Sequence, residues 1–126
     1  MASILVVDGP NKGAYYPLER RMVLVGRDED CLIQIVYEQV SRMHLKIWYE
    51  QTGKVYRARD MKSANGTFID GRQIDGEVLL VPGMKIRLGN TELIFCEVDY
   101  SSPEVAFEHY ERERQKGERG KETMIR

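Results

Sequence analysis

Residues 39–60, QVSRMHLKIWYEQTGKVYRARD, contain two stretches with the pattern of β-strands. Leu45, Ile47 and Tyr49 alternate with other residues, as a strand with one buried face requires. Residues 51–53, QTG, then supply a turn, and a second stretch rich in β-forming residues follows at 54–59. This segment favours a fold built from short strands joined by turns.

The same pattern extends over residues 3–98, where glycine, proline, asparagine and aspartate mark the turns. Besides the two strands above, of which the first starts at His44, strands are expected at 3–7, 14–18, 23–25, 32–35, 67–69, 84–88 and 92–98. Many short strands at regular spacing, without a helical pattern between them, predict an all-β sandwich or barrel.

The pattern changes near residue 100. Ser101–Glu104 combine a hydroxyl cap, a proline in the first turn and an acid at the positive helix end, which together predict a helix start. We expect a short charged helix over residues 100–117 and a flexible tail over 118–126. The apolar stripe of this helix is narrow and consists of Ala106, Phe107 and Tyr110. The helix is therefore expected to rest lightly on the sandwich or to project from it.

Composition limits the possible functions. The 126 residues fit one domain, and 19 basic against 20 acidic residues give a net charge of -1, which does not favour binding to nucleic acid or an anionic membrane. The apolar stretch at residues 4–7 is too short for a signal peptide or a membrane span. Cys31 and Cys96 have no metal-site spacing and fit reduced packing residues, so we expect a cytoplasmic protein without a cofactor or metal.

Several polar residues lie next to strand ends and suit a phosphate group. Arg27 follows a strand, Ser41 and Arg42 precede one, and Asn65 lies in a third loop. Arginine offers a planar fork for two charge-assisted bonds, serine a hydroxyl donor, and asparagine an amide that can pair with a peptide backbone. Because a sandwich gathers its loops at two ends, these residues can converge on one site.

The order of these segments resembles the forkhead-associated (FHA) domain family over residues 3–98. The resemblance rests on Gly26-Arg27, Ser41-Arg42-Met43-His44, Asp60 with Ser63-Ala64-Asn65-Gly66-Thr67, Pro82-Gly83 and Ile86-Arg87-Leu88-Gly89. It implies an FHA-type β-sandwich of about eleven strands in residues 1–99, which binds phosphothreonine peptides through loops at one end and is not an enzyme.

The resemblance also implies roles for single residues. Arg27 and Ser41 would hold the phosphate, Asn65 would bind the peptide main chain, and Arg42 would contact peptide or phosphate. Gly26, His44 and Gly66 would support the site, with His44 bracing the Ser41 loop. Ala64, Asp70 and Lys85 depart from residues common in the family. Of these, only Ala64 is expected to weaken phosphate binding, although its backbone N–H survives.

Two other interpretations remain open. Ser41 and His44 could form a hydrolase dyad, but their spacing across a loop-to-strand junction does not require them to face each other, and no obvious orienting acid or nucleophile elbow accompanies them. The loops could also serve a phosphate-independent scaffold or oligomerisation module. Peptide titrations with and without phosphate separate this second interpretation from phosphothreonine recognition.

The expected partner is a protein or peptide that carries phosphothreonine, written by a Ser/Thr kinase. Thr123 is the one threonine of the C-terminal tail, where a kinase can reach it. Phosphorylated Thr123 is therefore a candidate ligand for the domain itself, in cis or in trans.

Overall fold

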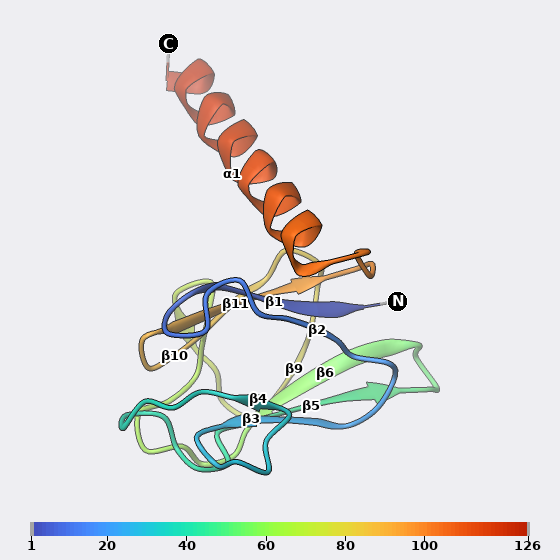
Figure 1. The fold of residues 1–126 in the computed structure, drawn as a ribbon, viewed down its shortest axis with the longest axis vertical. Coiled ribbons are helices and arrows are strands. Elements are labelled where there is room, and N and C mark those ends of the chain that lie inside the picture. The colour runs from blue at the N-terminus through green and yellow to red at the C-terminus, as the bar shows by residue number, and fades with distance from the viewer. Residues whose placement is uncertain (1, 126) are drawn as a thin grey trace.

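The computed structural model describes the backbone of residues 2–125 and the side chains of residues 2–115. Eleven strands form two packed sheets, with one helix at the C-terminal end (Figure 1). The strands are β1 Ser3–Asp8, β2 Tyr15–Pro17, β3 Val23–Gly26, β4 Ile33–Gln34, β5 Leu45–Glu50, β6 Val55–Asp60, β7 Phe68–Ile69, β8 Arg72–Gln73, β9 Glu77–Leu79, β10 Lys85–Leu88 and β11 Thr91–Cys96. The predicted β-sandwich is confirmed.

The strands divide into two sheets. The six-stranded sheet has the order β2-β1-β11-β10-β7-β8, and the five-stranded sheet has the order β4-β3-β5-β6-β9. Neighbouring strands are antiparallel except for the parallel pair β3–β4. Leu45 and Ile47 of β5 are fully buried between the sheets, whereas Lys46 and Trp48 lie on the outer face, as the alternation predicted.

Strand β1 is buried on both faces, which explains its unbroken apolar sequence. Ile4 and Val6 join the core between the sheets, whereas Leu5 and Val7 lie on the outer face of the six-stranded sheet. There they pack against helix α1, which spans Pro103–Ile125. Ala106 of this helix is only 1% exposed. Figure 1 shows the helix docked by its first turns and projecting away from the sandwich.

The helix is longer than the sequence predicted. An end at Gly117 was expected, but α1 continues to Ile125 and takes in most of the residues expected to form a flexible tail. A glycine inside a helix costs about 1 kcal/mol, and the lysines, arginines and glutamates around Gly117 and Gly120 are good helix formers. Thr123 falls in this stretch, and its side chain lies outside the described residues.

Two strands were missed by the sequence analysis. Both residues of β8 and two of the three in β9 are exposed, so neither strand has an apolar alternation that could reveal it. Each is defined by its partner instead, because β8 pairs with β7 and β9 pairs with β6.

Candidate functional site

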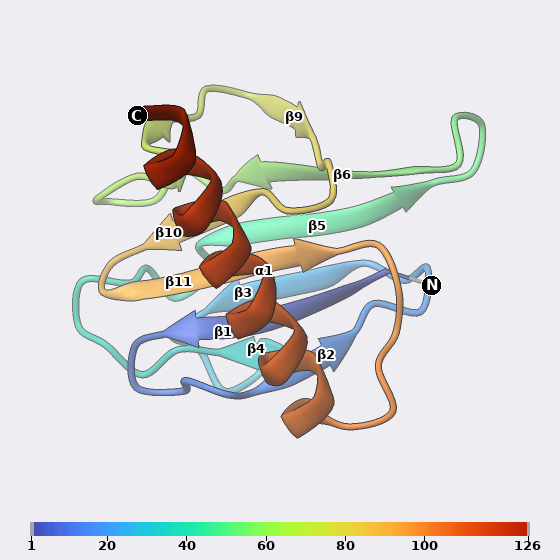
Figure 2. The same ribbon diagram turned by 90° about the horizontal axis from the view of Figure 1, so that it is seen from above.

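Three loops meet at one end of the sandwich, opposite the turn that joins β5 to β6 (Figure 2). They are residues 27–32 between β3 and β4, residues 35–44 between β4 and β5, and residues 61–67 between β6 and β7. The sequence-predicted site residues lie in these loops or at the strand ends beside them. The three loops are joined to one another by hydrogen bonds across long sequence separations.

Gly26 lets the first two loops approach closely. The N–H groups of Arg27 and Asp28 donate to the carbonyls of Ser41 and Arg42 at 3.0 and 3.1 Å. A Cβ atom at Gly26 would lie 2.2 Å from the carbonyl oxygen of Arg42, which is far inside van der Waals contact. Only glycine fits this crossing without moving the backbone.

His44 joins the second loop to the third. The side chain is fully buried, its Nδ1 accepts the N–H of Ser41 at 3.0 Å, and its Nε2 donates to the carbonyl of Gly66 at 2.9 Å. These partners assign the proton of the neutral ring to Nε2. Both ring nitrogens are therefore occupied by backbone groups of the two loops.

This arrangement is incompatible with a Ser41–His44 hydrolase dyad. The nitrogen nearest the serine is taken up by its backbone N–H, and the other nitrogen bonds to Gly66. The Ser41 hydroxyl oxygen instead accepts the N–H of Ala64 at 3.0 Å. The ring has no free acceptor with which to take the serine proton, as a general base must.

Asp60 anchors the third loop from the end of β6. One carboxylate oxygen accepts the hydroxyls of Ser63 and Thr67 at 2.6 and 2.7 Å, and the other accepts the N–H of Ser63 at 3.0 Å. Burial raises the pKa of Asp60, but these hydrogen bonds from Ser63 and Thr67 outweigh it, so the pKa lies below the usual carboxyl value. The carboxylate is therefore charged, and both of its oxygens accept hydrogen bonds from the loop.

Arg27, Ser41 and Asn65 form an open rim above this support. Arg27 is exposed, and its Nε donates to the carbonyl of Val40 at 2.9 Å, which leaves the terminal guanidinium nitrogens available. Asn65 is also exposed, and its Nδ2 donates to the carbonyl of Gln39 at 2.8 Å, which leaves its oxygen available. The Ser41 hydroxyl accepts from Ala64 and keeps its own proton to donate.

Arg42 differs from the three rim residues. Its side chain is 76% exposed and forms a 3.0 Å ion pair with Asp28, which is 13% exposed. A hydrogen bond from the N–H of Asp30 and the Arg42 guanidinium hold the pKa of Asp28 below its usual value. Arg42 thus ties the second loop to the first, a contact that the sequence analysis did not foresee.

The three departures from the family pattern have separate positions. Ala64 lies in the rim, and its N–H is the donor to Ser41. Asp70 and Lys85 bond to each other, because the N–H of Asp70 donates to the carbonyl of Lys85 and the N–H of Lys85 donates to the Asp70 carboxylate. Their contacts join β10 to the end of β7 and involve none of the rim residues.

The sequence analysis missed the roles of Asp60, Ser63 and Thr67. A local signal was present, because an aspartate followed three residues later by serine is typical of a turn capped by side-chain hydrogen bonds. Asn65 and Arg27 are held by the backbone carbonyls of Gln39 and Val40. Backbone acceptors are present in every residue, so the sequence could not identify these two.

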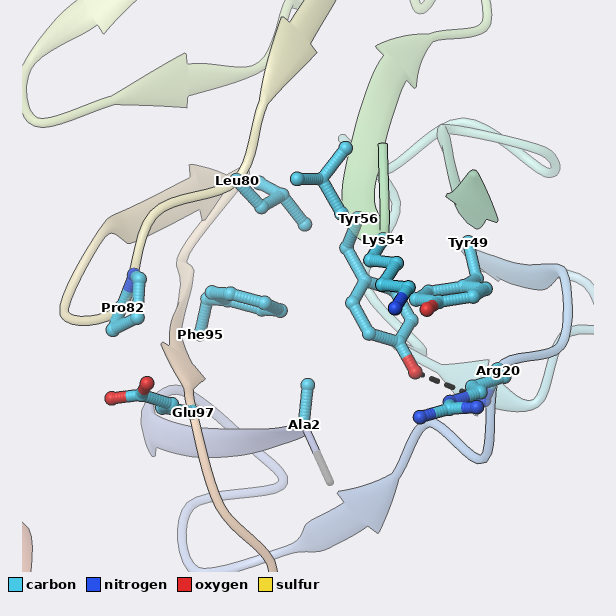
Figure 3. Close-up of a pocket in the computed structure, with 10 residues that line it drawn as sticks. Ala2, Arg20, Tyr49, Lys54, Tyr56, Leu80, Pro82, Phe95 and Glu97 are labelled. Carbon is cyan, nitrogen blue, oxygen red and sulfur yellow. Dashed lines mark hydrogen bonds between the residues drawn. The ribbon is translucent and has the colours of Figure 1, made fainter. Parts of the chain in front are cut away.

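A separate hollow of about 330 Å³ opens at the opposite end of the sandwich (Figure 3). Tyr56 and Phe95 form its aromatic floor, and the Tyr56 hydroxyl accepts the N–H of Arg20 at 2.9 Å. None of the sequence-predicted site residues lines it. Within the described residues there is no cluster of metal-ligating side chains and no helix suited to cross a membrane.

Comparison with known proteins places this geometry in a family. Residues 23–89 match the family model described as the FHA domain. The chain belongs to the FHA family. An FHA domain from work on phosphothreonine-dependent FHA domain interactions superposes with a TM-score of 0.68 at 28% identity, covering 79% of this chain and 98% of that one.

Two curated relatives are named as an inhibitor and as a regulator. The oxoglutarate dehydrogenase inhibitor of Corynebacterium diphtheriae is 34% identical over 76% of this chain and 66% of its own length. The glycogen accumulation regulator GarA of Mycolicibacterium smegmatis is 31% identical over 75% of this chain and 58% of its own length. This chain therefore spans less than two thirds of the length of these relatives.

Proposed function

We propose that this FHA domain binds phosphothreonine peptides through Arg27, Ser41 and Asn65. The observation that carries the proposal is that these three residues, far apart in sequence, lie on hydrogen-bonded neighbouring loops and keep unused donors or acceptors facing solvent. The solved relative studied for phosphothreonine-dependent interactions supports the choice of ligand.

Each rim residue has a distinct task in this proposal. The terminal nitrogens of Arg27 form charge-assisted bonds to two phosphate oxygens, and the Ser41 hydroxyl donates to a third. The N–H of Ser41 is already bound to His44 and takes no part. The Asn65 oxygen accepts an N–H of the peptide main chain, which fixes the ligand's direction.

Titration with matched peptides tests the proposal. A peptide with a central phosphothreonine should bind with a measurable Kd by isothermal calorimetry, and its unphosphorylated twin should not. A phosphoserine twin, which lacks only the γ-methyl group, measures the preference for threonine. Equal binding of the phosphorylated and unphosphorylated peptides would instead establish the phosphate-independent scaffold.

The role that fits this binding is an adaptor for proteins marked by a Ser/Thr kinase, rather than an enzyme. The occupied nitrogens of His44 support the absence of hydrolase chemistry at the rim. Incubation with p-nitrophenyl phosphate, and separately with p-nitrophenyl acetate, should release no nitrophenol above background. The cytoplasmic location stays a prediction from the sequence.

Phosphorylated Thr123 remains a proposed ligand of the same domain. Helix α1 docks by its first turns and projects away from the sandwich (Figure 1), so binding between two molecules is favoured over closure within one. Calorimetry of residues 1–100 with a peptide of the last eleven residues, phosphorylated and not, tests this. Failure of the phosphorylated peptide to bind, while another phosphothreonine peptide does, would exclude it.

A further inference from the structure

We infer that a second anion-binding subsite lies on the outer face of the five-stranded sheet, formed by Lys46, Arg59 and Lys62. It takes a carboxylate or a second phosphate on the same peptide whose phosphothreonine occupies the rim. The inference rests on the proposed function and extends it, because it specifies which side chains near the phosphothreonine are favoured.

The first observation is a pair of like charges on neighbouring strands. Lys46 of β5 lies directly opposite Arg59 of β6, an arrangement that destabilises a sheet when nothing neutralises it. Within residues 2–115, neither side chain forms an ion pair with a carboxylate within 4.0 Å. The Lys46 ammonium instead lies 5.1 Å from the centroid of the Trp48 ring. An anionic ligand would relieve this repulsion.

The second observation is a hollow of about 600 Å³ beside the β6–β7 loop, which could receive such a ligand. Its charged lining is Lys46, Arg59, Lys62, Asp60 and Asp75. The carboxylate of Asp60 accepts hydrogen bonds from Ser63 and Thr67 and keeps its negative charge. Three cations therefore face two carboxylates in the hollow, and the net positive charge makes an anion the complementary ligand.

Lys62 connects the hollow to the rim. It lies three residues before Asn65 in the same loop and holds a left-handed backbone conformation with φ of 56°. This conformation costs a residue with a Cβ free energy, and it persists in a loop that Ser63 fixes by donating to Asp60 and accepting the N–H of Gly66. Because an extended peptide advances ~3.3 Å per residue, a residue a few positions from the phosphothreonine can reach the hollow.

Glu77 provides an internal test of the charge argument. It lies opposite Arg59 on β9, on the side away from Lys46, and no ion pair within 4.0 Å among the described residues joins the two side chains. Glu77 opposes a bound anion through space without touching the loops of the rim. Its neutralisation should therefore change anion binding in the direction opposite to that of Arg59.

The experiment scans the position of one added negative charge. The parent peptide has a central phosphothreonine and alanines elsewhere. Each variant replaces one alanine, among the five positions on either side, with a glutamate or a phosphoserine. We expect at least one position to lower Kd by about fivefold with glutamate and by more with phosphoserine. Glutamate and phosphoserine together distinguish the two sources of the anion.

Variants then assign the gain to these residues. Lys46→Gln and Arg59→Gln should remove the gain without weakening the parent peptide, and their melting temperatures should stay level or rise as the repulsion disappears. Glu77→Gln should enlarge the gain, and Lys85→Gln on the other sheet should leave it unchanged.

Two outcomes would overturn the subsite. One is that no position improves binding although the parent peptide binds, and the other is that the gain survives in Arg59→Gln. If the parent peptide itself does not bind, the proposed function and the subsite are overturned together. This result is distinct from the two outcomes above, because in both of them the parent peptide binds.

Discussion

The buried support of the site and its exposed rim are built on opposite principles. In the support, His44, Asp60 and Thr67 satisfy their hydrogen-bonding groups among themselves and with the backbone. In the rim, Arg27 and Asn65 use one group each to fix the side chain and leave the others facing solvent. The comparison indicates that substitutions in the support should act on stability, whereas substitutions in the rim should act on affinity.

The largest effect is expected from Arg27→Ala in the rim. Loss of two charge-assisted bonds should weaken phosphothreonine peptide binding by about 2–5 kcal/mol, measured by calorimetry. The melting temperature should hardly change, because the side chain is exposed and loses a single bond to Val40. Normal peptide binding by this variant would show that Arg27 does not belong to the site.

His44→Ala should show the reverse balance. It leaves the N–H of Ser41 and the carbonyl of Gly66 without partners, which should lower the free energy of unfolding by about 1–3 kcal/mol. Peptide affinity should fall only through the loosened Ser41 loop. Urea unfolding measures the first effect, with Glu108→Ala at an exposed position of α1 as the control. An unchanged stability combined with lost affinity would make His44 a direct ligand.

A smaller, pH-dependent effect should come from Asp60. Its pKa is lower in the folded protein than in the unfolded chain, so the charged carboxylate stabilises the fold. That stability is present above the unfolded-state pKa of about 4 and is lost as the pH falls through the lower folded-state pKa. Melting temperatures of the protein and of Asp60→Asn, measured from neutral to acid pH, should converge as the pH falls. Parallel curves would exclude this role.

The smallest effect is expected from Arg42→Ala, which separates the Asp28 contact from a ligand contact. The side chain is highly exposed and already paired, so peptide affinity should fall by about two- to fivefold only. Asp28→Asn provides the matched test, because it frees Arg42 without removing it. A loss as large as that of Arg27→Ala would place Arg42 directly on the phosphate.

Local patterns predicted much of the fold. The alternation in β5 identified its buried residues Leu45 and Ile47, and the apolar run of β1 was found although it has two buried faces. The short strands β8 and β9 were missed because exposed residues carry no alternation. The helix end was misplaced because a glycine weakens a helix without always ending it.

The candidate site was predictable in its residue types and not in its contacts. Ser41 and Ala64 are 23 residues apart, and Asn65 and Gln39 are 26 residues apart. Such pairings depend on how the sandwich aligns its loops, which no local pattern records. The pairing of Arg42 with Asp28 shows the limit most clearly, because the sequence gives no sign that this arginine already has a partner.

The docking of α1 on β1 has a practical consequence for surface-based binding assays. Ala2 lies beside the aromatic hollow at the end remote from the loops, and α1 leaves the outer face of the six-stranded sheet (Figure 1). A biotin or fluorophore attached at the N-terminal end next to Ala2, or at the C-terminal end of α1, is therefore far from the rim. Immobilisation through the helix would therefore orient every molecule with its loops accessible, and peptide kinetics could be recorded on one uniform population.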